Sequence, residues 1–335
     1  MAGCGARWSS LHGEQQDLFG APAAAAGIEI VRAAVPDEQV VQVARRLPKN
    51  LHFGTSSWSF PGWVGIVYAQ LYSPSVLSRY GLSAYAKHPL LNAVNVDSTF
   101  YKVQTAEHLA GYAAEVPETF RFMVKAYAGL TTVPDSPMAV RRRVDPVFLD
   151  ARFAAREVVG PLVDAFGPKL GALLFQFSPL GAPYTREPRH FIARLGELLC
   201  ALPSGPTYAV ELRDPELLGS EYESVLRAAG AVHCANVHSR MPPVNQQVQA
   251  EARGAKGPLL IRWMLHPGDD YESAGARYAP FDRIREPDKL NRDRIAAMVS
   301  AGLSAGRDIH VIAANNAEGS APLTLCELAK TIVTN

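Results

Sequence analysis

The chain has 335 residues, 48% of them hydrophobic and 19% charged, which is enough to bury one large core or two smaller ones. Its 33 basic and 32 acidic residues give a formal net charge of +1, so no overall field draws it to nucleic acid or to an anionic membrane. The four cysteines are scattered without CxxC spacing, and charges or prolines interrupt every apolar stretch, so we expect a cytoplasmic protein with no membrane role.

Residues 1–50 are rich in Ala, Gly and Gln, and we expect them to form a partly disordered N-terminal extension with a short helix over 36–47. Within this extension, the sequence QQDLF resembles the peptide by which bacterial replication and repair proteins dock on the sliding clamp. Gln15, Asp17, Leu18 and Phe19 occupy the constrained positions. The extension therefore predicts a tether to the clamp. The alternative is an accidental match in which the two apolar residues pack on the main domain.

From residue 51 onward, apolar runs typical of buried strands alternate with helical segments. We predict strands over residues 51–57, 93–97, 120–126, 171–177, 207–213, 231–237, 258–264 and 308–315. We predict helices over residues 75–87, 106–115, 147–166, 187–201, 215–229, 288–305 and 322–333, and a long loop over 129–145. The stretch 238–257 is typical of a Gln-rich loop rather than a helix.

Eight strands alternating with helices predict an α/β fold, a TIM-type (β/α) barrel with a reduced sixth helix, as one domain over residues 51–335. A doubly wound sheet would normally carry a glycine-rich phosphate loop after its first strand, and this sequence has none.

Several predicted strands finish on polar side chains, and in such barrels the chemistry lies where the strands' carboxyl ends emerge. Side chains alternate along a strand, so every second residue faces the barrel interior. This alternation predicts that the following residues point inward: Asn95, Asp97, Arg121, Met123, Lys125, Leu174, Gln176, Ala209, Glu211, Arg213, Arg262 and Asn316. Arg121 lies near the opposite end and is expected to be structural.

A purely structural network is the alternative to a functional site, because isolated buried charges are costly and should pair, as Lys125 would with Glu211. The position of these side chains at the carboxyl ends of the strands favours a functional site.

Seven segments, in this order, resemble the YecE-like proteins, or domain of unknown function 72, over residues 51–335. They are GTSSW at 54–58, VNVDSTFY at 94–101, FMVKA at 122–126, LLFQFSP at 173–179, VELR at 210–213, IRW at 261–263 and NN at 315–316. The resemblance implies a TIM-type barrel and no established activity. The chain departs from it at Asn95, Asp97, Thr131 and Thr132, where the family pattern has an acidic residue, an asparagine and a Thr-His pair. The positions that match, and so mark the expected pocket, are Lys125, Gln176, Glu211, Arg213, Arg262, Asn315 and Asn316.

This residue set favours an anionic ligand, because Arg262 offers a planar fork and Lys125 a point charge to a phosphate or carboxylate. Glu211 is the expected general acid or base, with Lys125 as the second catalytic residue. We therefore expect an enzyme of hydrolase or lyase type without cofactor or metal. His233, Cys234 and His238 are the only local metal-ligand candidates, and such residues in an apolar strand more often pack. A glycosidase would require Asp97 to face Glu211.

Two loops at the predicted barrel mouth add ligand-binding candidates. The first carries Trp58, Phe60, Trp63 and Tyr68, which would stack on a sugar or base or would close the barrel as an apolar plug. Arg141–Arg143 in the loop after the third strand would contact phosphates, or would simply be solvated. Together these loops support the alternative function, a nucleic-acid-binding or DNA-repair module recruited by the clamp tether.

Overall fold

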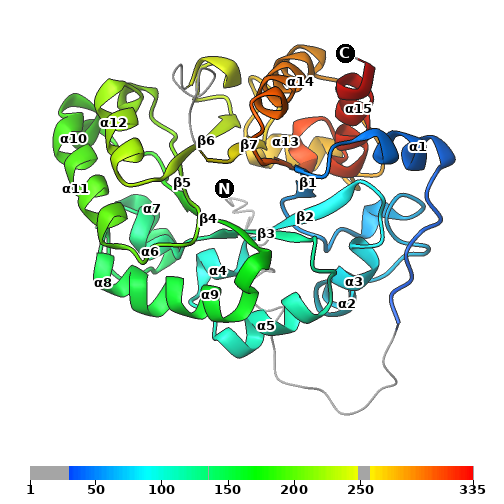
Figure 1. Cartoon of the computed structure of the whole chain (residues 1–335), viewed down its shortest axis with the longest axis horizontal. Coiled ribbons are helices and arrows are strands. Elements are labelled where there is room, and N and C mark those ends of the chain that lie inside the picture. The colour runs from blue at the N-terminus through cyan, green and yellow to red at the C-terminus, as the bar shows by residue number, and fades with distance from the viewer. Residues whose placement is uncertain (1–29, 135, 248–256, 335) are drawn as a thin grey trace, which may run out of the picture.

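The computed structural model describes residues 30–134, 136–247 and 257–334. Parallel strands form a closed barrel in sequence order, surrounded by helices (Figure 1). The strands are β1 (Leu51–Thr55), β2 (Leu91–Val96), β3 (Arg121–Lys125), β4 (Leu170–Gln176), β5 (Tyr208–Glu211), β6 (Val232–Val237), β7 (Leu259–Trp263) and β8 (Ile309–Ala313). The predicted TIM-type fold is confirmed.

The helices lie outside the strands (Figure 1). The α-helices are α1 (Glu38–Arg46), α2 (Pro74–Tyr80), α3 (Leu82–Tyr85), α4 (Ser98–Tyr101), α5 (Ala106–Ala114), α6 (Ala128–Thr131), α7 (Pro137–Arg142), α8 (Ala151–Phe153), α9 (Gly160–Phe166), α10 (Ala182–Arg186), α11 (Pro188–Ala201), α12 (Ser220–Ala228), α13 (Tyr271–Tyr278), α14 (Lys289–Ser304) and α15 (Ala321–Thr334). The 3₁₀ turns are η1 (Pro61–Trp63), η3 (Gly167–Lys169), η4 (Pro215–Leu217), η5 (Val244–Gln246) and η7 (Asn315–Ala317), and η2 (Ala154–Val159) is a π-helix.

Strands β1 and β8 pair in register from Leu51 with Ile309 to Thr55 with Ala313, which closes the barrel. Helix α1, in the stretch assigned to the N-terminal extension, lies beside α15 (blue and red in Figure 1), and Arg46 Nη2 donates to the carbonyl of Val333 at 2.7 Å. The described part of the extension therefore packs on the barrel. No helix of the described residues is long and apolar enough to cross a membrane.

Two separate sets of apolar side chains fill the two faces of the strands. The larger set lies between strands and helices. The inner set fills the barrel and consists of Ala93, Met123, Ala172, Leu174, Ala209, Val232, Cys234, Leu260 and Ile312. The alternation of side chains along each strand produces this division. The predicted inward direction of Met123, Leu174 and Ala209 is confirmed.

The elements between β3 and β4 differ from the prediction. The expected loop over 129–145 contains α6 and α7, and α7 begins because the Ser136 hydroxyl accepts from the amide of Ala139. The expected single helix over 147–166 is divided into α8, the π-helix η2 and α9. Pro161 explains the division, since proline has no N–H to donate one turn back and its ring crowds the preceding turn.

Between β6 and β7 the described residues contain a single 3₁₀ turn, η5, in agreement with a reduced sixth helix. Gln247 holds this connection against the barrel, because its amide nitrogen donates to the carbonyls of Asn236 and Pro242. The insertion before α14 contains α13, which the sequence did not predict.

Candidate functional site

Six of the polar side chains predicted to meet at the carboxyl ends of the strands form one cluster, and all of them except Asp97 and Gln176 are buried. Its centre is Glu211, at the end of β5, which is fully buried. One carboxylate oxygen pairs with the guanidinium of Arg213, and the other accepts from Arg262 Nη1 at 2.5 Å. Gln176, at the end of β4, accepts from the same nitrogen at 3.0 Å. We call Asp97, Lys125, Gln176, Glu211, Arg213 and Arg262 the polar cluster.

The charges around Glu211 decide its ionisation. Burial by itself raises the pKa of this carboxyl, but the positive charges of Arg213, Arg262 and Lys125 outweigh burial and lower the pKa to about 2. Glu211 is therefore a carboxylate at neutral pH.

Arg262, in β7, is the most enclosed cation of the cluster. Its side chain is fully buried, and Nη1 makes both of its described hydrogen bonds. Nε and Nη2 are buried without a hydrogen-bond partner among the described residues. An unsatisfied buried donor costs about 1–3 kcal/mol, and more when the group is charged. Arg262 thus has buried donors that an oxyanion would satisfy.

Lys125, at the end of β3, pairs with Asp97 rather than with Glu211 as the sequence predicted. Nζ lies 2.9 Å from Asp97 Oδ1 and 5.3 Å from the centre of the Phe100 ring. Asp97 follows β2, which adjoins β3, whereas Glu211 is two strands away, so the neighbouring carboxylate is the partner. Burial, with a contribution from Arg262, lowers the pKa of the Lys125 amine.

The polar cluster contains three cations and two carboxylates, which leaves one net positive charge in a largely buried site. Arg121 lies at the other end of β3, where Nη1 donates to the carbonyls of Glu118 and Phe120. It takes no part in the cluster.

Trp58 was predicted to bind ligand, but the structure places it in the apolar core. Only 6% of its surface is exposed, its indole N–H donates to the carbonyl of Leu77, and its ring packs edge-on against Tyr112. Trp63 and Tyr68 are also buried, and the Tyr68 hydroxyl donates to the carbonyl of Trp58. The aromatic loop after β1 therefore forms an apolar plug.

Asn315 and Asn316 were predicted as pocket residues, with Asn316 on the eighth strand. β8 ends at Ala313, and both asparagines lie in η7. Asn315 Oδ1 accepts from the Trp63 indole N–H at 3.2 Å and from the Ala321 amide at 2.9 Å, so it joins the plug to the start of α15. Asn316 is half-buried, and its amide nitrogen donates to the carbonyl of Tyr271 at 3.4 Å.

Tyr271 and His238 border the polar cluster, and no sequence pattern assigns Tyr271 to it. Tyr271 begins α13 in the insertion after β7 and keeps 40% of its surface exposed. Burial raises the pKa of Tyr271, and the nearby positive charge of Arg213 opposes this shift. The His238 ring lies 5.8 Å from the Tyr271 ring, and burial together with Arg213 lowers the pKa of His238 to about 4.

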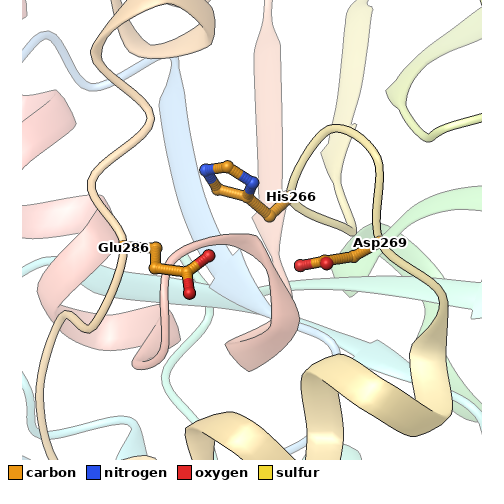
Figure 2. A group of neighbouring side chains, drawn as sticks. All are labelled: His266, Asp269 and Glu286. Carbon is orange, nitrogen blue, oxygen red and sulfur yellow. The ribbon is translucent and has the colours of Figure 1, made fainter.

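A second group of chemically active side chains lies in the insertion after β7. Figure 2 shows His266, Asp269 and Glu286, whose ligand atoms all lie within 4.8 Å of one another, close enough to hold a cation. The guanidinium of Arg277 already pairs with both carboxylates, with Nη2 at 2.5 Å from Asp269 and Nε at 2.9 Å from Glu286. A fixed positive charge there opposes a metal ion, so the group functions as an ion-pair network.

His233 and Cys234, on β6, are the metal-ligand candidates of the sixth strand. The two ring nitrogens of His233 contact the Tyr222 hydroxyl at 2.9 Å and Gln247 Oε1 at 3.3 Å, and Cys234 belongs to the apolar inner set. His233 therefore packs in a hydrogen-bonded core position.

Comparison with known proteins identifies the family. A model of the family described as "Protein of unknown function DUF72" matches residues 52–334. The UPF0759 protein YunF of Bacillus subtilis (strain 168) is 31% identical over 139 residues, which is 39% of this chain and 45% of that protein. The chain thus aligns with less than half the length of this relative.

Two solved structures share the fold. A DUF72 family protein from Enterococcus faecalis V583 is 17% identical, with a TM-score of 0.56 over 85% of this chain and 96% of that one. A DUF72 family protein from Thermotoga maritima MSB8 is 18% identical, with a TM-score of 0.55 over 84% and 98%. At these identities the likeness is one of fold.

Proposed function

The chain belongs to the DUF72 family, whose description gives no activity, and we propose that this member is an enzyme that binds a phosphate- or carboxylate-bearing ligand at the carboxyl face of its barrel. Arg262 carries the proposal. Its guanidinium is fully buried beside a site of net positive charge, and two of its nitrogens have no described hydrogen-bond partner. An oxyanion would accept from both and would balance the charge.

The carboxylate of Glu211 serves in this proposal as a fixed counter-ion. With a pKa of about 2 it does not donate a proton at neutral pH and is a weak base, which argues against the proton-transfer role that the sequence suggested. Held between Arg213 and Arg262, it orients both guanidinium groups toward the ligand.

Lys125 is the better candidate for proton transfer. Its pKa is lowered by burial, and Asp97 holds its amine in place at 2.9 Å. A protonated amine with a lowered pKa donates a proton to a leaving group more readily than an ordinary lysine does. The reaction supported best is therefore a hydrolase or lyase step with Lys125 as general acid and Arg262 as the oxyanion holder.

Binding of inorganic phosphate tests the ligand class. At constant ionic strength, phosphate should raise the melting temperature of the wild type more than chloride does, because a ligand bound only by the folded state stabilises it. Lys125→Met should weaken phosphate binding about tenfold, the loss of one charge-assisted contact. Lys330→Met, which removes a half-exposed lysine paired with Glu327 on α15, is the matched control and should bind as wild type. Equal responses to phosphate and chloride would refute anion binding.

Turnover of aryl phosphates tests the enzymatic part separately. We expect hydrolysis of phenyl phosphate or its diester, with a loss of at least about 10²-fold in Lys125→Met, because an unactivated phenolate needs a proton from a general acid as it leaves. Phosphate binding without turnover of either ester would argue for a non-catalytic binding protein.

A second candidate keeps the same face but makes the protein a nucleic-acid-binding or repair-associated module. The exposed side chains of Arg141 and Arg143, on and after α7, support it because exposed arginines contact phosphates without sequence preference. The proposed clamp peptide, Gln15–Phe19, lies outside the described residues. Retention of the chain by purified sliding clamp tests whether this peptide is a tether.

We also propose a cytoplasmic location. Within the described residues, Cys200 and Cys326 are free thiols, which supports a reducing compartment.

A further inference from the structure

Arg142, the last residue of α7, differs from the arginines on either side. Arg141 and Arg143 are exposed, whereas Arg142 is half-buried. Its Nη1 donates to the hydroxyl of Ser178 at 3.0 Å and, more weakly, to that of Thr132 at 3.5 Å. Its guanidinium lies 4.8 Å from the centre of the Phe100 ring. Ring and hydroxyls together fix the orientation of the guanidinium.

This oriented cation has no carboxylate partner among the residues that the structure describes. Both of its described hydrogen bonds use Nη1 and go to neutral hydroxyls, so the edge formed by Nε and Nη2 makes none to the described residues. Burial lowers the pKa of Arg142. The Nε and Nη2 edge of this half-buried guanidinium is therefore available to an anion from outside the chain.

Arg142 lies close to the polar cluster through Phe100. Lys125 Nζ is 5.3 Å from the centre of the same ring that Arg142 contacts at 4.8 Å. The charges of Lys125 and Arg142 are therefore separated by at most the sum of these two distances. Ser178 follows Gln176 by two residues after β4, so Arg142 and the polar cluster share the carboxyl face of the barrel.

We propose that Arg142, with the hydroxyls of Ser178 and Thr132, forms a second anion subsite, and that the ligand carries two phosphate-type groups, one at Arg142 and one at Lys125 and Arg262. This inference rests on the proposed function, because it takes the polar cluster as the first anion site. The free edge of the guanidinium faces the second group, and each hydroxyl, which accepts from Arg142, keeps its own hydrogen to donate.

Two kinds of molecule supply this chemistry. One is a small diphosphate, and the other is a nucleotide chain with successive phosphates. Inorganic pyrophosphate represents the first and a thymidine dinucleotide with a 5′-phosphate the second, with inorganic phosphate as the single-group reference.

The test is calorimetric titration of the full chain with the three probes at constant ionic strength. The variants are Arg142→Gln, Arg142→Lys and, as the matched control, Arg156→Gln, which removes an exposed arginine that pairs with Glu157 in η2. We expect Arg142→Gln to weaken the tighter-binding two-phosphate probe about tenfold and to leave phosphate within about twofold, since only one of two charge-assisted contacts is lost. Arg142→Lys keeps the charge without the fork and should give an intermediate loss. Arg156→Gln should change neither.

The outcomes separate this inference from the proposed function. If phosphate binds the wild type but Arg142→Gln leaves both two-phosphate probes unchanged, the second subsite is refuted and the polar cluster remains an anion site. Equal weakening of phosphate and the two-phosphate probes would refute it also, because Arg142 would then belong to a single site. If the wild type binds none of the three probes, both proposals fail. A loss confined to pyrophosphate or to the dinucleotide identifies the source of the two groups.

Discussion

At the scale of single residues, Glu211 has the largest consequence because it neutralises two buried arginines. Glu211→Gln should lower the free energy of unfolding at pH 7 by about 3 kcal/mol, the typical effect of leaving buried charges unpaired. Urea denaturation measures the change. Glu327→Gln, in a half-exposed pair with Lys330, is the control and should cost less than about 1 kcal/mol.

The stability that Glu211 contributes through its ion pairs with Arg213 and Arg262 depends on pH in a defined direction. The folded-state pKa of Glu211 is about 2, below its ordinary value of 4.5, so its contribution is complete above that ordinary value and is lost as the pH falls toward 2. The difference between wild type and Glu211→Gln should therefore shrink on acidification. A difference at pH 7 below about 1 kcal/mol would contradict the pairing.

A stacked histidine pair at the amino end of the barrel gives a second prediction. The rings of His52 and His310 lie 4.8 Å apart and are buried, and burial together with Arg121 lowers their pKa values to about 4 and about 3, although Asp308 acts in the other direction on His52. Because the pKa values of both histidines are lowered in the folded chain, protonation favours the unfolded chain. The stability that the two neutral rings contribute is therefore complete above pH 6.5 and falls below it.

Replacing one ring tests this effect. Each such histidine should cost about 2 kcal/mol of stability between pH 7 and pH 5, so His310→Phe should lose correspondingly less than wild type over that range. Urea unfolding at the two pH values measures it. His190→Phe, an exposed substitution on α11, should retain the wild-type pH dependence. Identical slopes for His310→Phe and wild type would show that the pair does not titrate as described.

Side-chain parity made several inward residues predictable, whereas their partners were not. Lys125 was correctly placed at the end of a strand, but its expected partner was Glu211. The actual partner, Asp97, is closer because β2 adjoins β3, and the register of β3 with β4 shifts between Phe122 and Met123. Alternation fixes which face a residue takes, while pairing depends on register and height, which a single sequence does not contain.

At the scale of elements, Asn315 joins the aromatic plug to α15. Asn315→Ala should lower the free energy of unfolding by about 1–3 kcal/mol, because the Trp63 indole N–H and the Ala321 amide lose their acceptor in a buried setting. Phosphate affinity should stay unchanged, since the residue holds the plug rather than the ligand. Urea unfolding and titration of the same variant check both parts. A large loss of affinity with full stability would restore the ligand-binding role predicted from the sequence.

Helices and strands were predictable where the local sequence carried a clear apolar pattern. The alternating apolar runs identified the strands within a few residues, and α11 and α14 begin and end close to their predicted bounds. The insertion before α14 was not predicted to contain α13, so Tyr271 was not assigned to the site. Its place beside Arg213 depends on how that insertion folds over the barrel, which is a tertiary contact without a sequence signal.

At the scale of the whole molecule, the proposed tether makes a separate prediction. If Gln15–Phe19 docks on the sliding clamp, purified clamp should retain the wild-type chain but not a Leu18→Ala, Phe19→Ala double variant, because these two side chains would fill the apolar pocket. Phosphate binding should be the same in both proteins, which shows that the barrel is intact. Equal retention would refute the tether and leave the barrel site unaffected.

The central claim, that the carboxyl face of the barrel binds an oxyanion through Arg262 and Lys125, is tested most directly by anomalous diffraction from crystals soaked in selenate. We predict a selenium peak at the polar cluster, with an oxygen about 3 Å from Arg262 Nη2 or Lys125 Nζ. A well-ordered carboxyl face without such a peak, in crystals that hold selenate elsewhere, would contradict the claim.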